Sequence, residues 1–363
     1  AARSPAILVG SRICEADAVG PLVAVAERLG APVIHEAATS HGRSSFPSDH
    51  PLAAGMLPFW SPDVRRRLQE FDVLLVAGMK LLQQYIYHEP ARAVPESCRI
   101  VHLDDDPWEV GKNYPVEVGV VGHPRVALAE LAAELDARMT DDQRRAARRR
   151  SQARQSDLAG QRQALRRQGE AEMGLRPITP RGLMELLARV LPHDVAVVEE
   201  SPTTTDCYFE RVGALRNTTG YFAQRGWALG WGLNCAIGVQ LAWPERPVLA
   251  ILGDGSTLYG LQGLWTAAHY RLPVTFLVTN NTQYKILKDC ARVLGLPNAM
   301  AHQYLGLDLV DPPVDYVRLA EAMGVKACRL GEPDAVSDAV RQSLEGDEPR
   351  LIEVPIQAPA DQP

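Results

Sequence analysis

The feature that most limits the fold is a pair of apolar runs, each followed at once by polar residues. Residues 248–255 read VLAILGDG, and residues 274–281 read VTFLVTNN. Continuous apolar runs of this length are typical of strands buried in a parallel sheet. Asp254 ends the first run, and Asn281 ends the second 27 positions later, close to the length of one strand-helix-strand unit. Because a right-handed crossover returns the chain beside its start, we expect both side chains at one edge of one sheet.

The residue types at that edge suit a bound metal and a diphosphate. Oxygen atoms from an aspartate, an asparagine amide and a backbone carbonyl are hard ligands of the kind that Mg2+ prefers. Gly253 and Gly255 allow a sharp turn, and we expect one helix from Thr257 to about Tyr270 with Trp265 on its inward face. Amides at its start, near Ser256, add donors for an anion. An ordinary Gly-Asp-Gly turn is the alternative, but the two asparagines at this spacing favour a Mg2+–diphosphate site.

The rest of the chain repeats the alternation of strand-like and helix-like segments. It predicts an α/β fold of two doubly wound parallel-sheet domains, with helices on both faces of each sheet. We expect the domains at residues 1–138 and 178–363, joined by an Arg-rich linker over 139–177. The linker has almost no apolar period, so a helical or extended connection is expected. A nucleic-acid patch is disfavoured because no aromatic residues are interleaved with its arginines.

Composition excludes several classes of protein. A net charge of -6 gives no reason to expect nucleic acid or an anionic membrane as a partner. The apolar runs, such as residues 73–78, are far shorter than the ~20 residues that a membrane-spanning helix needs. Six scattered cysteines form no C-x-x-C pair, which favours reduced thiols over a disulfide framework. No secretory signal is recognised, so we expect a cytoplasmic protein.

The GDG and NN motifs resemble the cofactor motif of the thiamine-diphosphate (ThDP)-dependent enzymes, which opens with GDG and closes with NN. Within that superfamily the sequence is most similar to benzoylformate decarboxylase and its relatives. The similarity is carried by GDGSTLYGLQGLWTAAHYRLPVTFLVTNNTQY at 253–284, and is supported by EESPTTT at 199–205 and GVQLAWPERPVLAILGDG at 238–255. It implies a Rossmann-like middle domain followed by a ThDP diphosphate-binding domain.

The resemblance also implies roles for individual residues. Asp254 and Asn281 are expected to bind Mg2+ through their side chains, and Gln283 through its carbonyl. Thr203 and Ser256 are expected to hold the diphosphate. The residues expected to bind the cofactor are Thr203, Gly253, Gly255, Ser256, Leu229 and Tyr284.

The reactive end of the cofactor is expected to meet a second set of residues. Leu229 stands where the family places the bulky residue that bends thiamine into a V shape, and the Trp227 carbonyl is expected to meet the aminopyrimidine. His88 is the candidate for proton transfer, although the alignment places Tyr85 or Ile86 at that position. Leu287 and Cys290 are expected to border the substrate. Cys290 replaces an aromatic residue of the family, which argues against an aromatic substrate.

The function implied is Mg-ThDP-dependent, non-oxidative decarboxylation of a small 2-oxo acid. The family also has a pyrimidine-binding domain with a catalytic glutamate, and this sequence begins where the middle domain does. We therefore expect that the chain needs such a domain for full activity, that Glu36 is an exposed loop residue and not that glutamate, and that the protein is a homodimer or homotetramer.

Three alternatives stay open. The first is a carboligase resembling acetolactate synthase, and the second is a cofactor-binding module without activity of its own. The third is an NAD- or FAD-binding Rossmann protein, which is weakened because residues 1–140 contain no G-x-G-x-x-G motif after the first strand. The middle domain is expected to be structural, without FAD.

Overall fold

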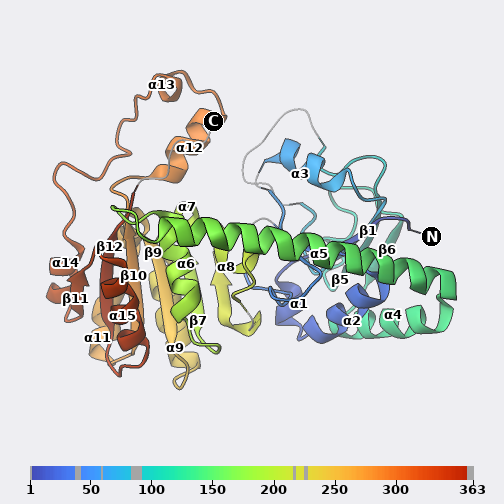
Figure 1. Ribbon diagram of the computed structural model, residues 1–363, viewed down its shortest axis with the longest axis horizontal. Coiled ribbons are helices and arrows are strands. Elements are labelled where there is room, and N and C mark those ends of the chain that lie inside the picture. Colours follow the sequence, from blue (N-terminus) through green and yellow to red (C-terminus); the bar gives the residue numbers. More distant parts are fainter. Residues whose placement is uncertain are drawn as a thin grey trace. The chain divides into compact units, whose positions relative to one another are not determined.

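Alternating apolar strands and helices build two six-stranded sheets, and every strand pair within them is parallel. This confirms the predicted fold class. The computed structural model describes residues 2–36, 42–58, 60–82, 92–215, 218–224 and 228–357. The chain divides into two units (Figure 1): Ala1–Ala164 with Glu210–Thr219, and Leu165–Phe209 with Gly220–Pro363.

The first unit has the strand order β3-β2-β1-β4-β5-β6, which is the order of a Rossmann sheet. Alternate residues of β1 face opposite sides: Ile7 packs in one apolar cluster with Leu22 of α2, and Leu8 packs in another with Leu68 of α3. Helices therefore cover both faces. The elements are β1 (Pro5–Val9), α1 (Arg12–Glu15), α2 (Val19–Leu29), β2 (Val33–His35), β3 (Ala53–Met56), α3 (Ser61–Leu68), β4 (Val73–Ala77), β5 (Arg99–Asp104), β6 (Val118–Val121) and α4 (Pro124–Arg138).

The Arg-rich segment forms a single helix, α5 (Asp141–Glu172), of 32 residues. Its alanine, arginine and glutamine residues have high helix propensity, which explains a long helix with little apolar surface. Residues of α5 up to Ala164 belong to the first unit, and those from Leu165 belong to the second.

The second unit has the strand order β11-β12-β10-β9-β7-β8. One face of this sheet packs on Leu233 of α9, Leu264 of α11 and Tyr316 of α14. Figure 1 shows α6 and α15 across the other face. The elements are α6 (Pro180–Val190), β7 (Ala196–Glu200), α7 (Pro202–Thr205), β8 (Tyr221–Ala223), α9 (Trp231–Ala242), β9 (Val248–Gly253), α10 (Asp254–Gly260), α11 (Gly263–His269), β10 (Val274–Asn280), α12 (Lys285–Val293), α13 (Pro297–Met300), α14 (Tyr316–Ala322), β11 (Lys326–Arg329), α15 (Pro333–Leu344) and β12 (Arg350–Pro355). Two short elements, α8 (Tyr208–Arg211) and η1 (Thr218–Gly220), lie at the ends of the segment that is assigned to the first unit and are divided between the two units.

The strand-helix-strand unit predicted from the two apolar runs is present, but its helix differs from the prediction. β9 and β10 are adjacent and parallel, with Gly253 opposite Thr279. The single helix expected over residues 257–270 is instead two short helices, α10 and α11. A Cβ on Gly260 would lie 2.6 Å from the Gly230 carbonyl oxygen, so close packing against the start of α9 accompanies the break. Trp265, expected to face inward, is 55% exposed.

Two further expectations concern burial and membranes. Glu36 was expected to be exposed, and this is wrong, because it is 5% exposed. It follows β2, beside the end of β1, where a Cβ on Gly10 would lie 2.8 Å from its Oε1 atom.

Among the helices that the structure describes, none combines the length and the apolar character that a bilayer crossing requires.

Candidate functional site

The carboxyl ends of β7, β9 and β10 lie side by side at one edge of the second sheet. Their ends are joined by buried hydroxyl groups. The Ser201 and Thr279 hydroxyl oxygens are 2.7 Å apart, and Thr279 donates a hydrogen bond of 3.1 Å to the carbonyl oxygen of Leu252. Ligands of parallel α/β sheets bind outside the carboxyl ends of the strands, so this edge is the candidate site.

Asp254 lies at the centre of this edge, directly after β9. Its side chain is buried, and Oδ1 accepts a hydrogen bond of 2.9 Å from the Gly255 amide. Oδ2 is buried without a hydrogen-bond partner among the described residues. Burial raises the pKa of Asp254 to about 6, against the opposing effect of the backbone amides of Gly255, Thr282 and Gln283. A carboxylate oxygen that is buried and unpaired is costly, which is the condition that a bound cation relieves.

The two asparagines that follow β10 have different partners. Asn280 donates a hydrogen bond of 2.8 Å to Glu353 and accepts one of 3.0 Å from the Thr282 amide. Asn281 accepts a hydrogen bond of 3.1 Å from the Gln283 amide. Thr282 has φ of 60°, a left-handed conformation that is rare for a β-branched residue. The turn is therefore held by side chains, and its amides act on the Asp254 carboxylate.

A paired loop fixes the residues after this turn. Tyr284 donates its amide to the Leu307 carbonyl at 2.9 Å, and Leu309 donates its amide to the Thr282 carbonyl at 2.8 Å. The Lys288 ammonium group of α12 donates a hydrogen bond of 2.7 Å to Gln283 Oε1 and pairs with Asp308. Sequence reasoning missed Lys288, because its partners lie on both sides of it and form no motif.

The remaining expected cofactor residues surround Asp254. Gly253 is the N-cap of α10, and Ser256 lies buried in its first turn. A Cβ on Gly255 would clash with the ring of Tyr284, so glycine is required for this close approach. Thr203 is half-buried in α7, and its neighbour Thr204 donates a hydrogen bond of 3.3 Å to Thr279. The fold thus brings these residues to the same edge.

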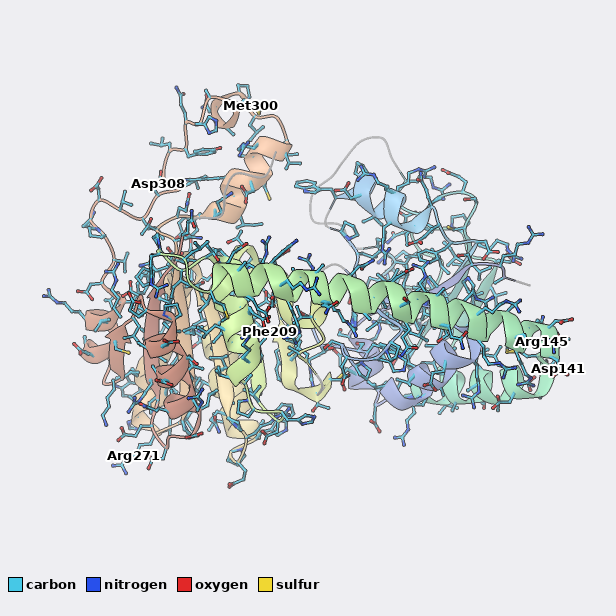
Figure 2. All side chains as sticks on the ribbon, viewed as in Figure 1. Asp141, Arg145, Phe209, Arg271, Met300 and Asp308 are labelled. Carbon is cyan, nitrogen blue, oxygen red and sulfur yellow. The ribbon has the colours of Figure 1, made fainter. Side chains whose placement is uncertain are left out.

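The residues expected at the reactive end are only partly described. Leu229 precedes α9 and is 40% exposed. Leu287 is exposed on α12, whereas Cys290, on the same helix, is buried, and burial raises the pKa of its thiol. His88 and Trp227 lie outside the described residues, as do Tyr85 and Ile86. Figure 1 shows α12 and α13 projecting from one end of the second sheet, and Figure 2 labels Met300 and Asp308 on this part of the chain.

Glu200 is a second buried carboxyl group at this edge, and sequence reasoning did not single it out. It ends β7, and its two oxygens accept hydrogen bonds of 2.8 Å from the Gly230 amide and 2.7 Å from the Gly232 amide. Burial raises its pKa to about 6, and the amides of the α9 start oppose that rise. No sequence signal links Glu200 to glycines thirty positions away.

Comparison with known proteins gives the family. Residues 1–131 match the thiamine pyrophosphate enzyme central domain, and residues 207–354 match the thiamine pyrophosphate enzyme C-terminal TPP binding domain. Benzoylformate decarboxylase of Pseudomonas aeruginosa is 32% identical over 98% of this chain and 61% of its own length. A probable acetolactate synthase large subunit of Methanocaldococcus jannaschii is 28% identical over 97% of this chain and 57% of its own length.

Solved structures agree with these matches. A thiamine diphosphate-dependent 4-hydroxybenzoylformate decarboxylase from Rhodococcus jostii RHA1 superposes with a TM-score of 0.80 at 28% identity, covering 98% of this chain and 62% of that chain. The chain thus spans about three-fifths of the length of these relatives. It belongs to the thiamine-diphosphate-dependent enzyme superfamily. Within that superfamily it is similar to benzoylformate decarboxylase, as its motifs predicted.

Proposed function

We propose that the second unit binds the diphosphate of ThDP through Mg2+ at the edge formed by β7, β9 and β10. Asp254 and Asn281 contribute side-chain oxygens to the metal, and Gln283 contributes its carbonyl. The observation that carries this proposal is the buried Oδ2 atom of Asp254, which has no hydrogen-bond partner among the described residues. Oxygen donors of this kind suit Mg2+, which completes its shell with phosphate oxygens and water.

Neighbouring residues complete the proposed cofactor site. Thr203 and Ser256 donate to the diphosphate, and the first turn of α10 adds backbone amides. Gly253 and Gly255 allow close backbone approach, and the Tyr284 ring closes one side over Gly255.

Bound ThDP supplies an electron sink for carbanion chemistry. In the proposal, Leu229 would give apolar support to the thiamine part of the cofactor, which suits its exposed position ahead of α9. The Trp227 carbonyl accepts from the aminopyrimidine, and His88 moves a proton. Leu287 and Cys290 border the substrate.

The proposed reaction is the non-oxidative decarboxylation of a small 2-oxo acid. It is supported by the similarity of the chain to two decarboxylases, the benzoylformate decarboxylase of Pseudomonas aeruginosa and the 4-hydroxybenzoylformate decarboxylase of Rhodococcus jostii RHA1. A carboligase reaction is the second candidate, supported by the acetolactate synthase relative, which matches nearly the whole chain. A cofactor-binding module without activity of its own is the third. We further propose a homodimer or homotetramer, and a pyrimidine-binding domain as a requirement for full activity, whichever polypeptide carries it.

The first unit is proposed to be structural, without FAD. Dinucleotides bind Rossmann sheets at the switch point between the two central strands, here β1 and β4. The chain's own groups fill that position. A Cβ on Gly10 would lie 2.5 Å from the Gly78 carbonyl oxygen, Ser45 donates to the Gly10 carbonyl at 2.7 Å, and Arg12 pairs with buried Asp104 at 2.7 Å.

Product analysis tests the proposed reaction. The chain, alone and mixed with a pyrimidine-binding domain of benzoylformate decarboxylase, is supplied with Mg2+, ThDP and either benzoylformate or pyruvate. Release of CO2 with one aldehyde per acid consumed supports the decarboxylase, whereas a ligated hydroxy-ketone product supports the carboligase. If the mixture converts neither acid, the decarboxylase and the carboligase proposals are both contradicted. The remaining candidate is then a cofactor-binding module without activity of its own.

A further inference from the structure

Glu200 binds the start of α9 through hydrogen bonds to both of its carboxylate oxygens. It is 5% exposed, and it accepts the Gly230 amide on Oε1 and the Gly232 amide on Oε2. Gly230 is the N-cap of α9 and Gly232 lies in its first turn, where backbone N–H groups lack intrahelical partners and the helix dipole favours negative charge. The carboxylate therefore fixes the position and the direction of the α9 start relative to the end of β7.

Other contacts remove the remaining freedom of this turn. The Asn234 side chain donates a hydrogen bond of 3.1 Å to the Gly230 carbonyl oxygen. A Cβ on Gly230, whose φ is 85°, would lie 2.6 Å from the carbonyl carbon of Tyr259. A Cβ on Gly232 would lie 2.7 Å from Cβ of Glu200. Residues 230–232 are thus held from the sides of β7, α9 and α10.

Leu229 is carried on this restrained turn. It directly precedes Gly230 and is 40% exposed, so its side chain is only partly enclosed by the chain. Its backbone position follows from the next residue, whose amide and carbonyl are both hydrogen-bonded within the unit. A displacement of the α9 start would therefore move Leu229.

Stability alone does not account for this arrangement. A buried carboxylate is expensive to desolvate, and burial raises the pKa of Glu200 despite its amide partners. A side-chain cap at Gly230 itself is excluded, because its φ is 85° and a Cβ there would lie 2.6 Å from Tyr259, so the helix start takes its acceptor from the end of β7. Costly buried groups are retained more often where they serve a functional geometry.

We propose that Glu200 is a positioning residue. It holds the backbone of Leu229 where the Leu229 side chain can support the thiamine part of the cofactor. This inference rests on the proposed ThDP function and divides the site in two. Asp254 and its neighbours hold the diphosphate. Glu200 acts through the α9 turn and Leu229, and it controls the affinity for the thiamine rings of the cofactor.

The division is tested by comparing two ligands. Calorimetry measures the affinity of the full chain, with Mg2+, for inorganic pyrophosphate and for ThDP. The unmodified chain is expected to bind ThDP more tightly than pyrophosphate. Glu200→Gln replaces one acceptor oxygen by an NH2 group that faces a backbone amide, so this preference is expected to fall about tenfold, as for one lost hydrogen bond to a charged acceptor. Pyrophosphate affinity is expected to stay within about twofold, because Asp254 is unchanged.

Glu185→Gln is the matched control. Glu185 is also a buried carboxyl group of the second unit, but it bonds to Tyr208 at 2.8 Å and to Arg189 at 2.8 Å, away from α9. Its substitution is expected to lower the unfolding temperature without changing the ligand preference. Leu229→Ala is expected to reduce the preference by itself, and adding Glu200→Gln to it is expected to have no further effect, because the two residues act in series.

The outcomes separate the two proposals. If Glu200→Gln weakens both ligands equally, keeps the full ThDP preference, or adds its full effect to Leu229→Ala, the positioning role is wrong. If the unmodified chain binds neither ligand with Mg2+, the proposed function fails, and the inference fails with it. Should Glu200→Gln not fold, Gly232→Ala crowds the same carboxylate, since its Cβ would lie 2.9 Å from Oε2, and the same loss of preference is expected.

Discussion

At the scale of single residues, the burial of Asp254, the proposed metal ligand, lowers the stability of the chain. Its pKa lies at about 6, compared with an ordinary value of 3.8. A rise of roughly two pKa units corresponds to about 3 kcal/mol of destabilisation when the carboxylate is ionised in the metal-free protein. The folded state binds the proton more tightly than the unfolded state does, so this residue lowers stability as the pH rises from about 4 to about 6.

Asp254→Asn is therefore expected to stabilise the metal-free chain at neutral pH. The gain in the free energy of unfolding should be near zero at about pH 4, where the carboxyl is protonated, and should grow to about 3 kcal/mol above about pH 6. Urea unfolding in the presence of a chelator, repeated from pH 4 to pH 8, measures it. A gain that does not change with pH, or a loss of stability at pH 8, contradicts the account.

Sequence spacing predicted the proximity of some residues of the candidate site and missed others, for a physical reason. Asp254 and Asn281 are found because one crossover connects their strands, so separation along the chain reports proximity in space. Glu200 and Lys288 are missed because their roles consist of bonds to backbone or loop groups whose positions depend on tertiary packing. Glu36 was misjudged for the same reason, since its burial comes from the close approach of β1 and β4 at Gly10.

At the scale of elements, apolar strands are the part that a sequence predicts best. β9 and β10 are buried over almost their whole length and lie where their apolar runs predict. β6 is exposed at every residue, and β3 follows a proline and contains a glycine, so neither has a pattern that marks a strand. The break between α10 and α11 depends on packing against α9, which a helical period does not report.

The loop that pairs with the turn after β10 gives a prediction at this scale. Lys288→Met removes the links to Gln283 and Asp308, so the loop should open more often, and the Leu309 amide should exchange with solvent faster by about tenfold, as for a lost hydrogen bond to a charged group. Hydrogen-exchange mass spectrometry measures this. Lys326→Met, which breaks an exposed ion pair with Glu348, is the control and should change nothing at Leu309. Equal exchange in Lys288→Met and the unmodified chain would contradict the role of Lys288.

At the scale of the whole molecule, the two α/β units differ at the carboxyl ends of their strands. At the switch point of the first unit, the chain's own groups pack together, among them the Arg12–Asp104 pair. At the edge of the second unit, one carboxylate oxygen of Asp254 has no partner in the part of the chain that the structure describes. The alternation of strands and helices predicted both sheets, because each element has to bury an apolar face against another. Chain contacts divide the molecule within α5 and assign Glu210–Thr219 to the first unit, a grouping that depends on tertiary packing.

The most direct test of the central claim is calorimetric titration of the chain with ThDP, in Mg2+ and in a chelator. The account predicts binding that requires Mg2+ and that Asp254→Ala abolishes, because the metal loses its charged ligand. Asp347→Ala, at an exposed site, should bind as the unmodified chain does. Equal binding of ThDP by Asp254→Ala and the unmodified chain, or binding that is unaffected by the chelator, would show that the edge of β9 and β10 is not the Mg-diphosphate site.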